Sequence, residues 1–156
     1  MPGRPDHPGE TVKALRPVLV VLVLLAPLGL AAPAQAVGEN CVATRLAERC
    51  AEVTGRNQRV TGEITAVATG DRVRVRVARA TLQRRTANGW VGISTVAPTV
   101  VFTQGSFVAS ANVPCADAPA GRYRATGTVK WKVGPRGTVR TGRITSTPVR
   151  RLRVCG

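Results

Sequence analysis

Histidine is nearly absent from this chain of 156 residues, and acidic side chains and aromatic rings are scarce. The single histidine, His7, lies in an N-terminal leader that we expect to be removed. Without it, the mature chain lacks the imidazole that Ser-His-Asp and Cys-His catalysis require. The remaining carboxylates are scattered, and none forms the facing pair of a glycosidase. We therefore expect no enzyme, no cofactor and no metal site.

Long hydrophobic runs are also missing, apart from one between Val18 and Ala32. That run follows a basic leader, is interrupted by Pro27 and Gly29, and ends in the small residues APAQA. A membrane-spanning helix needs about 20 apolar residues, whereas a short apolar run before an A-x-A site indicates a secretory signal peptide. We predict a signal peptide over 1–36, cleavage after Ala36, and a secreted, extracellular domain over 37–156. The alternative is an uncleaved membrane anchor.

Cysteine occurs four times, always after the predicted cleavage site. An even number of cysteines in an exported domain indicates disulfides. We predict a Cys115–Cys155 bond, because Cys115 precedes the strand that contains Tyr123 and Cys155 ends the last expected strand, so the bond would fix that strand to the sheet. Elimination then leaves Cys41 and Cys50 as the second pair.

The N-terminal segment 37–57 has two interpretations. Val42, Leu46 and Val53 fit the apolar stripe of a helix. On a helix, however, Cys41 and Cys50 would be about 13 Å apart along the axis, and a disulfide requires Cα atoms within roughly 7 Å. Either the segment is helical and its cysteines bond elsewhere, or Cys41–Cys50 closes a bent loop. We favour the loop.

From residue 58 onward the sequence alternates as strands do. In DRVRVRV, Val73, Val75 and Val77 share one face and the intervening arginines share the other. RYRATGTVKWKV at 122–133 likewise separates apolar from basic and hydroxylated positions. The alternation slips after Val77, which predicts a β-bulge, and Asn88-Gly89 predicts a hairpin.

These patterns predict an all-β fold. We expect a disulfide-stabilised antiparallel β-sandwich of about seven strands over 58–156. TVVF at 99–102 is one of the expected short strands. Trp90 and Trp131 are interpreted as core or cross-strand packing, and valine, alanine and threonine must supply most of the buried surface.

One stretch resembles a known family. DAPAGRYRA at 117–125 is similar to the start of strand F in immunoglobulin-like domains, and the resemblance implies that the Tyr123 hydroxyl binds nearby backbone. Ala125 stands where that family has a cysteine. The whole chain also resembles small exported β-sandwich proteins of GC-rich bacteria, most of which have no assigned activity. The resemblance implies an immunoglobulin-like fold and no particular function.

Positive charge is abundant. Removing the leader's three basic and two acidic residues leaves 20 basic and six acidic ones, a net charge of +14. Eighteen of the 20 are arginines, which suit planar contacts with phosphate or carboxylate. GC-rich codons account for arginine in place of lysine, but not for the excess of base over acid.

We therefore predict that the basic faces of two strands bind an anionic polymer, such as a wall polymer or extracellular nucleic acid, without sequence specificity. The candidate residues alternate along the two strands: Arg72, Arg74, Arg76, Arg122, Arg124, Lys130 and Lys132. In the alternative, the basic face serves structure and solubility, and the loops bind an unknown protein partner, for example an exported hydrolase that the protein inhibits.

Overall fold

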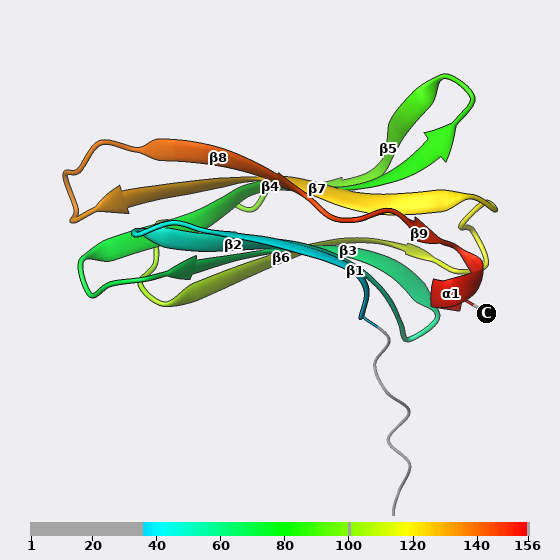
Figure 1. The fold of residues 1–156 in the computed structure, drawn as a ribbon, viewed down its shortest axis with the longest axis horizontal. Helices are drawn as coiled ribbons and strands as arrows, with labels where there is room; N and C mark the ends of the chain where they lie inside the picture. The colour runs from blue at the N-terminus through cyan, green and yellow to red at the C-terminus, as the bar shows by residue number, and fades with distance from the viewer. Residues whose placement is uncertain (1–35, 100, 156) are drawn as a thin grey trace, which may run out of the picture. The chain divides into compact units, whose positions relative to one another are not determined.

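Two antiparallel sheets face each other in the computed structural model, which describes residues 36–99 and 101–155 (Figure 1). Sheet A contains, in spatial order, β1 (Ala36–Ala43), β2 (Ala47–Arg56), β3 (Arg59–Ala68) and β6 (Ser106–Pro114). Sheet B has the order β5 (Gly89–Val96), β4 (Val73–Thr86), β7 (Arg122–Val133) and β8 (Arg140–Thr145). Residues 1–35 of the predicted leader lie outside the described part of the chain.

The chain changes sheet three times, between β3 and β4, between β5 and β6, and between β6 and β7. Pro148 separates β8 from the short strand β9 (Val149–Arg150), which pairs with the beginning of β7. A one-turn helix, α1 (Leu152–Cys155), ends the described chain. The predicted all-β antiparallel sandwich is confirmed: seven of the nine described strands, β3 to β9, lie within 58–156, where about seven were expected, and β1 and β2 precede them. Membership of the immunoglobulin-like family stays a prediction.

The helical interpretation of the N-terminal segment is wrong, because the segment forms the β1–β2 hairpin. Cys41 and Cys50 are directly opposite each other and are joined by a disulfide, with Cα atoms 4.1 Å apart. The favoured loop is thus an ordered hairpin that extends sheet A. The buried residues Ala47, Ala51 and Val53 follow the period of a strand, not of a helix.

The expected strand at 99–102 is not formed by the residues of that range that the structure describes, 99, 101 and 102. Between β5 and β6 the chain crosses from one sheet to the other, and only Thr103 forms a bridge, with Val75. Pro98 has no amide hydrogen to donate to a ladder. Val101, on this crossing, is 79% exposed.

Small side chains fill the space between the sheets. The buried set consists mainly of alanine and valine, with Ile64, Leu82, Tyr123 and Trp131 as the larger members. Contrary to expectation, threonine contributes little to it. Gly127 shows how close the sheets come, since a Cβ at this position would lie 2.5 Å from Cγ1 of Ile64.

Strand β4 keeps its apolar face buried along its length because of the predicted bulge. The register of β4 on β7 shifts between Val77 and Arg79. The shift keeps Arg79 exposed and buries Ala80 and Leu82. Before the bulge, the buried residues of the strand are Val73, Val75 and Val77. The predicted hairpin follows, with Thr86 opposite Gly89 and a positive φ of 120° at Gly89.

Cys115 and Cys155 form the second predicted disulfide. Cys115 follows β6 of sheet A, whereas Cys155 lies in α1, after β9 of sheet B. The prediction that Cys155 ends a strand is wrong, but the bond links the ends of the two sheets. Arg151 reinforces this junction by donating from Nη2 to the Cys115 carbonyl at 2.8 Å.

Tyr123 makes the backbone contact that the resemblance implies. Its ring is fully buried in the core, and its hydroxyl donates to the carbonyl oxygen of Pro119. Burial raises the pKa of the phenol above its ordinary value of 10.0, and the charges of Arg84 and Arg151 oppose part of that rise. The folded state therefore favours the protonated phenol.

We expect the two disulfides to contribute unequally to stability. Loss of Cys115–Cys155, whose cysteines are 40 residues apart, should lower the free energy of unfolding by about 4 kcal/mol in the chain-entropy estimate. Loss of Cys41–Cys50, with a separation of nine, should lower it by roughly 2.5 kcal/mol. Urea denaturation of the two double Cys→Ser variants measures both values. A larger loss at Cys41–Cys50 would contradict this ranking.

The Tyr123→Phe variant should lose about 1 kcal/mol of stability at neutral pH, because a buried hydrogen bond is lost. The wild type should lose stability as the pH rises through about 10, since the folded state holds the phenol proton more tightly than the unfolded chain does. The variant lacks this term, so the two stabilities should converge. Denaturation at about pH 8 and about pH 11 tests the convergence, and a constant difference would refute it.

Candidate polyanion-binding face

The two basic strands predicted from sequence are neighbours in sheet B. Arg74 lies directly opposite Lys132, and Arg76 lies directly opposite Lys130. Alternation places these four side chains on the outer face, because the intervening residues Val73, Val75, Val77, Val129 and Trp131 are buried. The structure thus brings together the cations that sequence alone assigned to separate strands.

The other predicted cations extend the face in both directions. Arg124 lies opposite Gln83 and donates from Nε to its Oε1 at 2.8 Å. Arg122, the first residue of β7, lies opposite Arg150 of β9. Arg72 precedes β4 in an exposed turn, so it borders the face instead of sharing the strand.

Four further cations on this face were not predicted. Arg79 is exposed at the bulge, Arg85 follows by alternation, Arg143 pairs with Thr128, and Arg150 pairs with Arg122. Alternation counted from the predicted bulge would have identified Arg85. Arg143 and Arg150 required knowledge of which strands adjoin β7. The outer face of sheet B therefore presents ten cations: Arg74, Arg76, Arg79, Arg85, Arg122, Arg124, Lys130, Lys132, Arg143 and Arg150.

Two aromatic rings lie among these cations. The guanidinium carbon of Arg124 is 4.3 Å from the ring centroid of Trp90, and that of Arg85 is 5.8 Å away. Near the other end of β7, Arg76 and Lys132 each lie 4.9 Å from the centroid of Phe102. Such cation–π contacts hold long basic side chains against the sheet.

Trp90 is thus a cross-strand packing residue and not a core residue. It is half-buried, whereas Trp131 on β7 is only 8% exposed and belongs to the core. The β4–β5 hairpin curls away from sheet A, which leaves its end without a facing layer (Figure 1). Of the two interpretations of Trp90, core or cross-strand packing, the structure supports the second.

The charges around Arg124 also act on one another. Burial, and then the charge of Arg85, lower the pKa of the Arg124 guanidinium. Arginine stays protonated in proteins despite such shifts. The shift therefore indicates an unfavourable electrostatic environment that a bound anion would improve.

Hydroxyl groups occupy the middle of the face. Thr81 and Thr95 contact each other through their Oγ1 atoms at 3.1 Å, and Thr145 donates to Thr126 at 3.3 Å. These threonines separate the cations near Phe102 from those near Trp90. These hydroxyl groups adjoin the row in which Arg79 and Arg143 flank Thr128, so the centre of the face combines hydroxyl groups with two cations.

The acidic side chains lie elsewhere. Glu39 and Glu63 both pair with Glu52, which places a row of three carboxylates on the outer face of sheet A. Glu48 lies on the same face by alternation. Asp71 and Asp117 lie in loops. Within the described part of the chain, the outer face of sheet B therefore carries no carboxylate.

The carboxylate row is electrostatically strained. Burial raises the pKa of Glu52, as do the charges of Glu63 and then Glu39, while Arg56 opposes the rise. Glu39 also groups with Cys41 and Cys50 at the spacing of metal ligands. Both sulfur atoms are consumed by the disulfide, so this group offers a metal only one carboxylate.

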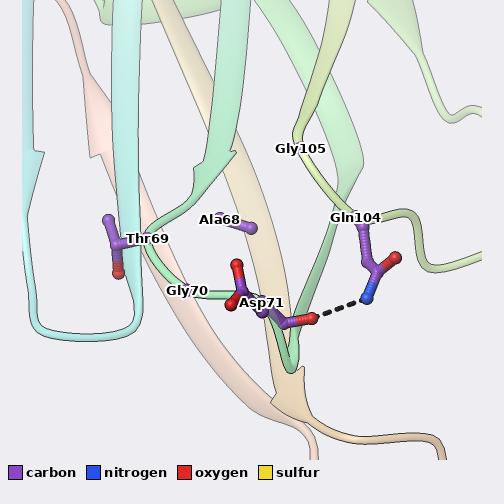
Figure 2. A pocket seen from close by; sticks show the side chains of 6 residues that line it. All are labelled: Ala68, Thr69, Gly70, Asp71, Gln104 and Gly105. Atoms are coloured by element: carbon purple, nitrogen blue, oxygen red, sulfur yellow. Dashed lines mark hydrogen bonds between the residues drawn. The ribbon is translucent and has the colours of Figure 1, made fainter.

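A hollow of about 520 Å³ lies at one end of the sandwich (Figure 2). The turn after β3 lines it with Ala68, Thr69, Gly70 and Asp71, and Gln104 closes it by donating from Nε2 to the Asp71 carbonyl at 2.6 Å. Among the described residues that line it, Asp71 is the one with an ionisable side chain.

Two findings bear on where the protein acts. Disulfides are typical of an oxidising, extracellular-type compartment. In the described part of the chain, none of the helical structure has the length and apolar character that crossing a membrane requires.

No protein-family model matches the sequence, and a comparison with curated proteins found no match.

We expect Glu52→Gln to stabilise the protein at pH 7. The folded state raises the pKa of Glu52 above 4.5, so the free energy of unfolding falls as the pH rises from about 4.5 through the folded-state pKa. The variant has no carboxylate to ionise at this position, so its free energy of unfolding at pH 7 should exceed that of wild type by a few tenths to about 1 kcal/mol. Below about pH 4 the difference should disappear.

Glu48→Gln is the matched control, because Glu48 pairs with Ala43 and Val67 and lies outside the row. Thermal or urea denaturation between about pH 3 and pH 7 compares the two variants with wild type. An equal gain in both variants would show that net charge, and not the row, is responsible.

Proposed function

We propose that this protein is a secreted binding module whose outer face of sheet B binds anionic polymers outside the cell. Binding is electrostatic and independent of sequence or fine structure in the polymer. The signal peptide predicted at 1–36 supports secretion, and both disulfides agree with it.

The observation that carries this proposal is the direct pairing of like charges. Arg74–Lys132 and Arg76–Lys130 are cross-strand neighbours on a face without a described carboxylate. Like charges directly opposite each other destabilise a sheet, by an amount comparable to the roughly 0.2–1 kcal/mol of favourable pairs. A phosphate or carboxylate polymer would remove this cost and release its own condensed counterions.

The face is also built to present its charges. Residues on the opposite side of β4 and β7 are fixed by the core, so the cations keep their spacing when a ligand binds. The contacts of Arg76 and Lys132 with Phe102, and of Arg124 with Trp90, reduce the freedom that these side chains would lose on binding.

Removing four cations should test the proposal. Arg74→Thr, Arg76→Thr, Arg124→Thr and Lys130→Thr combined should still fold, since threonine already occupies neighbouring outer positions on both strands. The variant should elute from heparin or phosphocellulose at much lower salt than wild type. Its dependence of log affinity on log salt should also be shallower, since fewer counterions are released.

A second quadruple variant with the same net charge is the control. In it, threonine replaces four exposed arginines that lie off the outer face of sheet B: Arg45, Arg56, Arg59 and Arg140. Its elution should stay near that of wild type. If both variants shift equally, net charge alone explains retention; if neither shifts, the basic face serves structure and solubility.

A further inference from the structure

We propose that the polymer bound by this face is a single-stranded nucleic acid, whose bases stack on Trp90 and Phe102 while its phosphates contact the surrounding cations. This inference rests on the proposed function, because it names the chemistry of the ligand at the same face. It adds a claim that electrostatics alone does not make, namely that the ligand carries flat aromatic groups.

The positions of the two rings carry the inference. The described residues include few aromatic side chains, yet two of them, Trp90 and Phe102, lie half-buried among the cations of this face. Base stacking on aromatic rings, combined with a basic surface that follows the backbone, is how proteins bind single strands without sequence preference. A polymer without rings would gain only the ordering of the cations and no stacking.

The spacing of the rings suits an extended strand. Trp90 contacts Arg124 and Phe102 contacts Lys132, and these cations are eight residues apart on β7. At about 3.3 Å per residue this corresponds to roughly 26 Å. A strand that follows β7 from Trp90 to Phe102 would therefore meet one ring and two cations at each end of its path.

The centre of the path suits the phosphate backbone. Thr81, Thr95, Thr126 and Thr145 expose hydroxyl groups between the two ring sites. Threonine hydroxyls, like arginine and lysine, are common donors to phosphate oxygens. A duplex keeps its bases stacked inside, where the flat outer face of a sheet cannot reach them, so a single strand fits better.

Fluorescence titration of the purified protein provides the test. Trp131 is buried in the core, so a change in tryptophan emission on binding reports mainly on Trp90. The probe is an oligothymidylate of about 12 nucleotides, within the site sizes known for sheet surfaces that bind single strands. An abasic strand of equal length and a polyphosphate supply the same charge without bases. Only the oligothymidylate should quench emission, and it should bind more tightly than the abasic strand.

Variants at Trp90 separate stacking from charge. Trp90→Leu should weaken oligothymidylate binding roughly 5- to 150-fold, the range for loss of one stacked base, and weaken abasic-strand binding much less, because there only the contact with Arg124 is lost. Trp90→Phe keeps a ring and should restore most of the affinity. Val91→Leu is the control on the same strand, because Val91 is exposed on the side of β5 opposite Trp90.

The outcomes distinguish this inference from the function on which it rests. Equal, salt-dependent affinity for oligothymidylate and the abasic strand would overturn stacking and leave a binder of phosphate polymers in general. No salt-dependent binding to any of the three probes would overturn both proposals. Equal losses for both strands in Trp90→Leu would show that Trp90 only positions Arg124.

Discussion

Strand alternation between two closely packed sheets is the constraint on which the rest of this structure depends. The interior has room mainly for alanine and valine, and at Gly127 it has no room for even a methyl group beside Ile64. Most charged side chains on the strands therefore point outward; Arg49 on β2 is an exception, because it faces sheet B and lies 5.5 Å from the ring centroid of Trp131. The fold does not determine which sign of charge each outer face receives, so that choice is left to the sequence.

Much of the architecture could be predicted because it depends on local alternation. The valine–arginine pattern of 71–77, the bulge after Val77 and the hairpin near Gly89 follow from side-chain period and turn chemistry. Each recurs in the structure within a residue or two. The contact of Tyr123 with Pro119 came instead from the family resemblance.

The errors have a common physical cause, which is that tertiary context overrode a short pattern. Val42, Leu46 and Val53 fit a helix, but the cross-strand Cys41–Cys50 bond and pairing with β3 favour strands. The segment 99–102 has the composition of a strand, yet the chain must change sheets there.

The candidate site could be predicted only one strand at a time. Sequence placed Arg74 and Arg76 on one face and Lys130 and Lys132 on another, but their direct opposition depends on β4 pairing with β7. Arg143 and Arg150 join the face through β8 and β9, whose register no local pattern encodes. The positions of the aromatic rings among the cations likewise required the three-dimensional fold.

Composition explains why the protein has many arginines more readily than it explains where the charges lie on the two outer faces. A GC-rich genome accounts for arginine replacing lysine, and the excess of base places cations on both outer faces, since Arg56 and Arg59 lie on that of sheet A. Composition does not explain why all four glutamates that follow residue 36 lie on sheet A, where three of them repel one another in a row. Ten cations share the outer face of sheet B, where a single glutamate would have relieved the Arg76–Lys130 opposition.

Both faces thus keep an electrostatic cost that exchanging a few residues between them would remove. Solubility does not require this separation, because interspersed charges keep a protein in solution equally well. A surface that meets a polyanion does require it, since a carboxylate within the face would repel each passing phosphate. The unfavourable pairing in the free protein is therefore the physical feature that a bound anionic chain would turn into affinity.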